Sequence, residues 1–197
     1  MGTRGLYGFR KNGIDKLTYN HYDSYPEVLG KNIVKFCKET SLEEMNEIFD
    51  RIILVHQDTK PNTQQIEECI EYYNDKVSSG SVDDWYCLLR ETQGDLRPYK
   101  NGLKYMLDDA EFIKDSLFCE YAYIINLDTN SLEFWKGFQE QPNINNRYGT
   151  ERTKGYANDW YPCMIQNSYP LEPKLFDKYS VQEYVDDMKG YEDGEIS

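Results

Sequence analysis

The chain has 197 residues, of which 35 are acidic and 22 are basic, so its formal net charge is −13. This balance excludes a nucleic-acid binder that works through a direct basic patch, and the length favours one domain with a substantial core. No apolar run approaches the roughly 18 residues of a membrane span, so we expect a cytoplasmic protein that does not bind a membrane.

The cysteines indicate a reducing compartment. They are odd in number, widely spaced and without a C-x-x-C pair, which is untypical of a disulfide framework or a zinc site. We therefore predict reduced, mostly buried thiols, with no metal site and no cofactor. The five cysteines are Cys37, Cys69, Cys87, Cys119 and Cys163.

An N-terminal hairpin is predicted over residues 3–22. Its turn is Asn12-Gly13, because a type I′ turn needs positive φ at both central residues and these two residue types tolerate it. A two-residue loop places Arg10 opposite Asp15 as a cross-strand ion pair, which supports this register.

The same register, continued outward, makes the open end of the hairpin rich in chemistry. It places Arg4 opposite His21 and Gly2 opposite Asp23, and side-chain alternation puts these four and Tyr19 on one face. We therefore expect Arg4 to lie within ion-pair reach of Asp23.

Residues 27–117 form a helical middle segment. Ser41 with Glu44 and Asn62 with Gln65 have the spacing of capping boxes, each followed by apolar residues at helical intervals. The helices are predicted over residues 27–38, 41–55, 62–73, 81–94, 99–107 and 109–117.

The C-terminal third returns to strands. Residues 120–138 read as a second hairpin, with a turn at 128–131. The segment 139–176 is irregular, with a long exposed loop over 140–158 and a short extra strand over 163–169. Residues 177–197 are an acidic helix and tail, helical over 181–188.

These elements predict an α+β fold. Two hairpins on either side of a helical segment are expected to pair into one antiparallel sheet with the helices packed against it. We place the boundary of this single domain at residues 1–176, with the acidic segment 177–197 outside it.

Three segments resemble a family of uncharacterised proteins from phages, bacteria and fungi. They are Gly2-Thr3-Arg4-Gly5, the run Tyr19-Asn20-His21-Tyr22-Asp23-Ser24-Tyr25-Pro26 with Leu29-Gly30, and the strand from Cys119 to Asp128. The likeness covers roughly residues 2–138. It brings no established activity, and it implies a phage or prophage accessory protein.

One interpretation of the N-terminal cluster is catalytic. Thr3 or Ser24 would be the nucleophile, His21 the base, Asp23 its orienting carboxylate and Arg4 an anion clamp. The distance between side chains two apart on one strand, about 7 Å, counts against a direct bond between His21 and Asp23.

A second interpretation is structural. Asp23 or Ser24 would accept backbone N–H groups where the first helix begins, and Pro26 would occupy its first position. Arg4 would pair with Asp23 and hold the N-terminal segment in place.

A third interpretation is a ligand pocket. Arg4 and the backbone of Gly2 and Gly5 would bind a phosphate or carboxylate, and tyrosines such as Tyr19 would stack on an organic ring. His21 and Asp23 would complete this site.

We conclude from the sequence that the protein works by binding. The expected function is that of a phage-type accessory protein that binds a host protein or a small anionic ligand. This expectation includes an anti-defence role. The alternative is a small hydrolase or transferase that uses Arg4, His21 and Asp23. The sequence leaves the oligomeric state open.

Overall fold

The N-terminal hairpin has the predicted register. In the computed structural model, which describes residues 2–152 and 160–191, strand β1 (Gly5–Lys11) pairs antiparallel with β2 (Ile14–Asn20). Asn12 and Gly13 have φ angles of 54° and 73°, as a type I′ turn requires. Arg10 lies opposite Asp15, and the Arg10 Nη1 to Asp15 Oδ1 distance is 2.8 Å.

The second predicted hairpin also forms, from β5 (Tyr121–Asn126) and β6 (Ser131–Lys136). Its turn is attached to the first hairpin. The Asp128 carboxylate accepts the backbone N–H groups of Asn12 and Gly13 at 2.6 and 3.0 Å. These two bonds lower the pKa of Asp128 and hold the two turns together.

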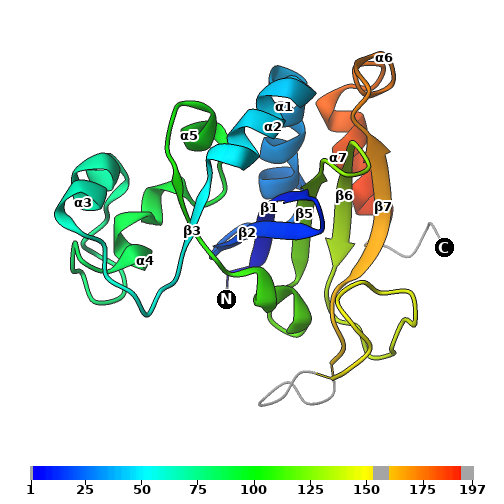
Figure 1. The fold of residues 1–197 in the computed structure, drawn as a ribbon. Helices are drawn as coiled ribbons and strands as arrows, with labels where there is room; N and C mark the ends of the chain where they lie inside the picture. The colour runs from blue at the N-terminus through cyan, green and yellow to red at the C-terminus, as the bar shows by residue number, and fades with distance from the viewer. Residues whose placement is uncertain (1, 153–159, 192–197) are drawn as a thin grey trace.

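The α+β prediction is confirmed, with a mixed sheet of order β2-β1-β5-β6-β7 (Figure 1). Strand β7 (Met164–Pro170) was predicted within the otherwise irregular segment 139–176. The two hairpins join through β1 and β5, which run parallel where we expected an antiparallel pair. The long helical crossover between them lets β5 return in the direction of β1, as parallel pairing requires.

Two helices of the middle segment begin where the capping boxes predict, whereas the helix predicted over 81–94 begins only at Trp85 and the one predicted over 109–117 is a 3₁₀ turn. Ser41 and Glu44 form a complete capping box, as do Asn62 and Gln65. The helices are α1 (Lys31–Glu39), α2 (Leu42–Arg51), α3 (Thr63–Cys69), α4 (Trp85–Leu88), α5 (Arg97–Lys100), α6 (Pro173–Phe176) and α7 (Val181–Gly190). A π-helical turn covers Pro26–Gly30, and 3₁₀ turns cover Ile70–Tyr72, Arg90–Thr92 and Ala110–Lys114.

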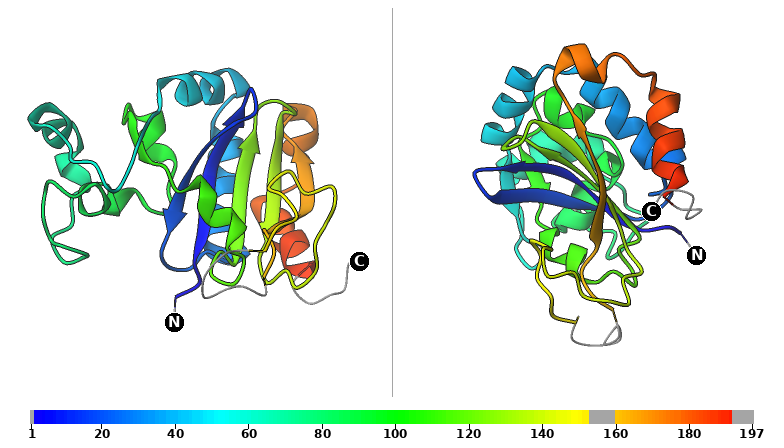
Figure 2. Two further views of the ribbon diagram at one scale, coloured as in Figure 1. Left: turned by 60° about the horizontal axis from the view of Figure 1, so that its bottom comes forward. Right: turned by 90° about the vertical axis from the view of Figure 1, so that its right-hand side faces the viewer.

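Two segments predicted as helical are instead strands. β3 (Ile53–Val55) and β4 (Tyr105–Leu107) pair in parallel as a separate two-stranded sheet. Both are short apolar runs, which periodicity cannot assign to helix or strand without their pairing partners. Figure 1 and the left view of Figure 2 show α3 and α4 beside this ribbon, away from the main sheet.

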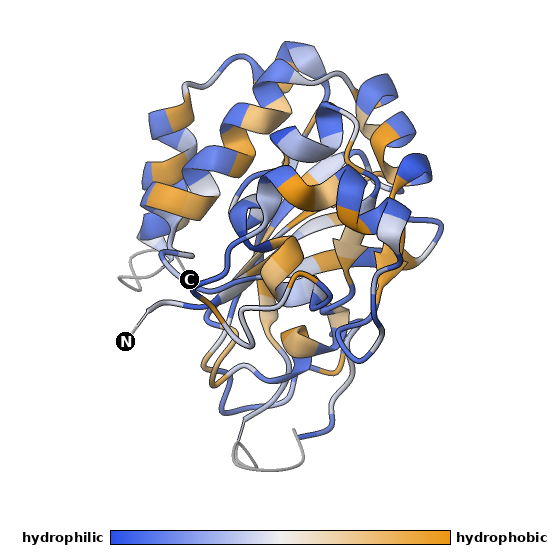
Figure 3. Ribbon diagram, turned by 90° about the vertical axis from the view of Figure 1, so that its left-hand side faces the viewer, coloured by the Kyte–Doolittle hydropathy of each residue, from blue (hydrophilic) through white to orange (hydrophobic). Residues whose placement is uncertain are grey.

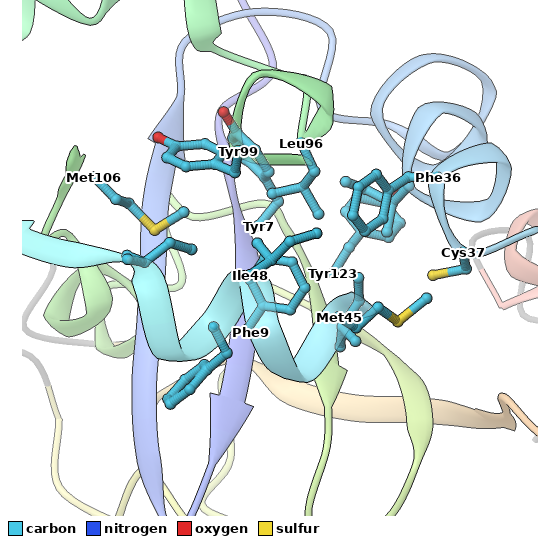
Figure 4. Packing of buried hydrophobic residues seen from close by; sticks show 14 of the residues in the cluster. Tyr7, Phe9, Phe36, Cys37, Met45, Ile48, Leu96, Tyr99, Met106 and Tyr123 are labelled. Carbon is cyan, nitrogen blue, oxygen red and sulfur yellow. The ribbon is translucent and has the colours of Figure 1, made fainter. Parts of the chain in front are cut away.

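Both faces of the main sheet are buried. On one face Tyr7, Phe9 and Tyr123 pack against α1 and α2, with Phe36, Met45 and Ile48 among the buried side chains (Figure 4). The helices show hydrophobic and hydrophilic residues side by side in Figure 3, as expected of helices with one buried side.

The opposite face is covered by the 110–114 turn and by the loop after β6. Residues 140–152 of this loop, predicted to be exposed, are partly packed: Tyr148 lies edge-on to Trp135, with ring centroids 5.1 Å apart. Arg147 forms two parallel hydrogen bonds with the Glu133 carboxylate, which is 5% exposed. Residues 153–158 of the predicted loop lie outside the described residues.

Helix α7 packs with the domain, although we predicted the 177–197 segment to be separate. Tyr184, Val185 and Met188 are buried, and Lys189 Nζ lies 2.6 Å from Glu27 Oε1. The right view of Figure 2 shows α7 beside α1 on one side of the sheet. Within the described ranges, no helix is long and apolar enough to cross a membrane.

Candidate functional site

The chain continues past the hairpin ladder at its N-terminal end. Gly5 and Asn20 are the last paired residues, and residues 2–4 run on between the start of β5 and the segment after β2. Glu120 N donates to Arg4 O at 3.0 Å, and Ser24 N donates to Thr3 O at 3.1 Å. Backbone bonds on both sides therefore fix the position of Arg4.

This extension forms one wall of a cavity of about 360 Å³, which we call the N-terminal pocket. It is lined by Gly2, Thr3, Arg4, Leu117, Phe118, Glu120 and Phe138. The Arg4 guanidinium carbon lies 5.4 Å from the centre of the Phe118 ring. Phe118 and Phe138 are 37% and 46% exposed, so the pocket presents apolar rings beside a cation.

The charge in the pocket is only partly balanced. Glu120 Oε1 accepts the Arg4 backbone N–H at 3.4 Å. Burial raises the pKa of Glu120. The hydrogen bond from the Arg4 backbone N–H and the positive charge of Arg4 act to lower this pKa, but burial has the larger effect. In residues 2–152 and 160–191, none of the ion pairs within 4.0 Å includes Arg4.

His21 and Tyr19 form a hydrogen-bonded pair on the shared face that the register predicts. His21 Nδ1 lies 2.8 Å from the Tyr19 hydroxyl, and the His21 backbone N–H donates to Gln93 Oε1 at 3.1 Å. Burial, followed by the charges of Arg90 and Arg4, lowers the pKa of His21. Burial raises the pKa of Tyr19 to about 12. At neutral pH the pair is therefore a neutral imidazole and a protonated phenol.

The predicted ion pair between Arg4 and Asp23 is wrong. The Asp23 carboxylate accepts the Tyr25 hydroxyl at 3.1 Å. Asp23 has a φ of 56°, in the left-handed region, so the strand alternation that we extended from the turn ends before this residue. The Asn20 amide donates to Tyr22 O and, at 2.8 Å, to Ser24 Oγ, and these bonds hold the bend.

Ser24 in this bend and Gly5 at the start of β1 are both buried. Ser24 is 0% exposed, and its carbonyl accepts the Tyr123 hydroxyl at 3.0 Å. A Cβ on Gly5 would lie 2.5 Å from Tyr121 O and 2.8 Å from Ser24 Cβ, so close backbone approach requires glycine here. Both residues therefore help to fix the backbone around the site.

The four catalytic candidates are not assembled. The His21 ring is hydrogen-bonded to the Tyr19 hydroxyl, Ser24 Oγ accepts from Asn20, and Asp23 accepts from Tyr25. Thr3 lies in the wall of the N-terminal pocket. Within the described ranges no Ser or Thr hydroxyl is hydrogen-bonded to the His21 ring.

The sequence reasoning missed the far wall of the N-terminal pocket. Leu117, Phe118, Glu120 and Phe138 flank the second hairpin, and the parallel pairing of β1 with β5 brings them to Arg4. The sequence signal that could have identified this wall is the presence of aromatic residues at the ends of the predicted second hairpin.

Arg90 was not among the residues predicted from the sequence, and its guanidinium lies near the Tyr22 and Tyr86 rings, 5.6 and 5.4 Å from their centres. A second hollow of about 280 Å³ adjoins this group and is lined by Tyr19, Gln57, Ser78, Tyr86, Asp109 and Phe112. Groups of His, Cys, Asp and Glu that could hold a metal are absent from the described part of the chain.

No family model matches the chain, and searches of curated proteins and of solved structures found no match.

Proposed function

We propose that this protein binds a small anionic ligand that carries an apolar or aromatic group, and that it does so in the N-terminal pocket. The observation that carries this proposal is the Arg4 guanidinium, placed against Phe118 in a cavity of about 360 Å³. A carboxylate or phosphate on the ligand would supply the missing counter-charge.

The chemistry of the wall supports this ligand class. A guanidinium binds a carboxylate or phosphate with two parallel hydrogen bonds, and Phe118, Phe138 and Leu117 offer apolar contacts for a ring. Glu120 and Leu117 in the pocket wall are partly buried, and the lower effective polarity of a partly buried site strengthens the bond to Arg4.

The alternative, a hydrolase or transferase built on Arg4, His21 and Asp23, has less support. Asp23 and His21 have separate hydrogen-bond partners, and neither Thr3 nor Ser24, the two candidate nucleophiles, is hydrogen-bonded to the His21 ring within the described residues. Binding without turnover requires none of these groups to be activated.

The wider context remains a prediction. A phage-type accessory protein in the host cytoplasm, with an anti-defence role among its options, is consistent with a binding pocket and an acidic body. A host protein is the other partner class that we expect, through surfaces distinct from the N-terminal pocket.

The proposal is tested by NMR titration of the full chain with benzoate and with benzamide, its neutral counterpart. We expect benzoate to shift the amide signals of residues 2–5 and 117–120 and to bind more tightly than benzamide. Arg4→Gln should weaken benzoate about tenfold, the loss of one charge-assisted pair in a half-buried site, and leave benzamide unchanged.

Arg97→Gln is the matched control. Arg97 is paired with Asp95 on the surface, so this variant removes the same charge without touching the N-terminal pocket. Equal affinities for benzoate and benzamide, or equal losses in the Arg4 and Arg97 variants, would contradict the proposal.

A further inference from the structure

A larger cavity, of about 400 Å³, lies at the β7 edge of the sheet. The cavity opens between β7 and α7. The N-terminal hairpin forms the opposite edge of the sheet, so the two are far apart in the strand order. The cavity is lined by Asn167, Tyr169, Tyr179, Glu183, Tyr184 and Asp187. We call it the tyrosine–carboxylate pocket.

Three tyrosines form its aromatic wall. The Tyr184 ring is nearly perpendicular to both others, with centroids 5.2 Å from Tyr169 and 6.0 Å from Tyr179. Tyr184 is buried and stacks on Phe176 at 4.6 Å, whereas Tyr179 is 48% exposed. A fixed ring therefore lies at the base, and a solvent-facing ring lies at the mouth.

The two carboxylates are held by neutral donors. Asp187 Oδ2 accepts from the Tyr169 hydroxyl at 2.6 Å and from the Asn167 amide at 3.0 Å, and Glu183 Oε2 accepts from Ser180 N at 2.7 Å. Burial, and then Asp187, raises the pKa of Tyr169, which keeps its hydroxyl a donor. No ion pair among the described residues includes Glu183 or Asp187.

Two lysines, Lys38 and Lys178, lie near the rings of this pocket, and neither forms an ion pair with Glu183 or Asp187 within the described ranges. Lys38 Nζ donates to Phe176 O at 3.0 Å and lies 3.8 Å from Asp177 Oδ1. It also lies 5.6 Å from the centre of the Tyr184 ring. Lys178 Nζ lies 5.8 Å from the centre of the Tyr179 ring, so the aromatic group already accommodates lysine ammonium groups. The hydrogen bonds from Ser180, and then the charge of Lys38, lower the pKa of Glu183, although no cation of the described residues lies within ion-pair distance of it.

The outer edge of β7 is poorly suited to adding a partner strand. The Gln166 side chain donates to Met164 O at 3.1 Å, and Ser168 N donates to Asn167 Oδ1 at 2.8 Å. The pairing with β6 also shifts register between Phe134 and Trp135. Such irregularities protect edge strands from pairing, so recognition here falls to side chains.

We propose that the tyrosine–carboxylate pocket binds an arginine side chain of a partner protein. A planar guanidinium stacks on tyrosine rings and has enough N–H groups to serve two carboxylates at once, which a lysine ammonium does less well. The net charge of −13 attracts basic protein surfaces. The exposed side chains of Tyr179 and Leu175 offer apolar contacts to residues that flank the arginine.

The test is an NMR titration of the full chain with the peptide Gly-Leu-Arg-Leu-Gly, whose leucines can contact Tyr179 and Leu175, and with the same peptide carrying citrulline, a neutral isostere of arginine. We expect the arginine peptide to shift the signals of Tyr169, Tyr179 and Asp187, and the citrulline peptide to leave them in place. Asp187→Asn, which keeps the side-chain shape, should weaken the arginine peptide about fivefold, the upper range for an accessible ion pair.

Asp186→Asn is the matched control, because it removes the same charge from the adjacent, exposed position of α7. The affinity of the Asp186→Asn variant for the arginine peptide should stay within about twofold of that of the unmodified protein, because this substitution changes only the long-range electrostatic field. Tyr179→Leu provides a second variant at an exposed position, and it should weaken the arginine peptide while leaving the melting temperature unchanged.

Three results would overturn the proposal. These are binding of the citrulline peptide as tight as that of the arginine peptide, equal losses in the Asp186 and Asp187 variants, and the absence of signal shifts at the tyrosine–carboxylate pocket. Acetyl-arginine-amide that binds as tightly as the peptide would assign the pocket to a free small cation and overturn the protein partner.

Discussion

At the scale of single residues, Arg4 differs from the arginines that stabilise the fold. Arg10, Arg97 and Arg147 each pair with a carboxylate, whereas Arg4 rests on Phe118 with only its backbone bonded to neighbouring segments. A guanidinium positioned in this way is available to a ligand. The neighbouring residues have a different, structural role, which is to fix the backbone.

Gly5 performs that structural task, and we predict that Gly5→Ala destabilises the protein. The new Cβ would meet Tyr121 O at 2.5 Å, and because this neighbour is backbone the strands must move apart. We expect the free energy of unfolding to fall by about 2–3 kcal/mol, as in overpacked cores. Urea denaturation monitored by circular dichroism measures this change.

Gly2→Ala provides the comparison for Gly5→Ala. Its Cβ would meet mainly the ring of Tyr22, a side chain that is 55% exposed, and would lie 3.0 Å from His21 O. The loss of stability should therefore stay below about 0.5 kcal/mol, typical of surface changes. If both variants lost equal stability, close packing at Gly5 would not be the cause.

His21 gives a prediction about pH. Its pKa is lowered from 6.5 in the folded protein by burial and by Arg90 and Arg4. As the pH falls through 6.5 the unfolded chain takes up a proton before the folded one does, so stability present above this pH is lost below it. Between pH 7.5 and 5.5 the melting temperature should fall further for the unmodified protein than for His21→Asn. Parallel melting curves across this range would contradict the lowered pKa.

At the scale of elements, the pair of Arg147 and Glu133 attaches the 139–152 loop to the sheet. Glu133 also accepts from the Asn126 amide at 2.7 Å and from the Trp135 indole at 2.9 Å. Burial acts to lower the pKa of Arg147, but the bonds to Glu133 raise it above the usual value. The loop is therefore held by a charge pair whose acidic member is buried.

We predict that Arg147→Met lowers the free energy of unfolding by about 2–4 kcal/mol, because it leaves a buried carboxylate without its cation. Adding Glu133→Gln to this variant should recover part of the loss, since the remaining buried group is then neutral. Chemical denaturation of the single and double variants measures both effects. A double variant less stable than Arg147→Met would contradict this explanation.

The elements that the sequence predicted well depend on short-range chemistry. The turn at Asn12-Gly13 and the capping box at Ser41 involve residues within four positions of one another. The strand Ile53–Val55 was missed because its partner, Tyr105–Leu107, lies some fifty residues away. The position of Asp23 was missed because a single residue with positive φ ended the strand alternation.

The candidate site shows the same division. The sequence placed Tyr19 and His21 on one face and singled out Arg4, all from one hairpin register. The rings that complete the N-terminal pocket, Phe118 and Phe138, reach it through long-range sheet pairing. No local pattern contains that pairing, so the far wall of the pocket required the three-dimensional structure.

At the scale of the whole molecule, the net charge of −13 acts on the two proposed sites in opposite directions. The field of the body favours cations at the tyrosine–carboxylate pocket and opposes anions at the N-terminal pocket, where Arg4 acts locally. At physiological ionic strength, dissolved salt screens the charges of the body over about 8–10 Å. As salt is added, long-range electrostatic interactions with a ligand therefore weaken before the interactions at contact distance do.

We therefore predict different salt dependences for the two probes. Between about 20 and 300 mM salt, a range in which the Debye length shrinks severalfold, the affinity for the arginine peptide should fall steeply. The affinity for benzoate should fall much less, because screening removes the repulsion of the body together with part of the attraction to Arg4. Titrations of the same protein sample at four salt concentrations measure both slopes. Equal slopes would mean that the charge of the body does not reach either pocket, and the two sites would then have to be explained by contacts alone.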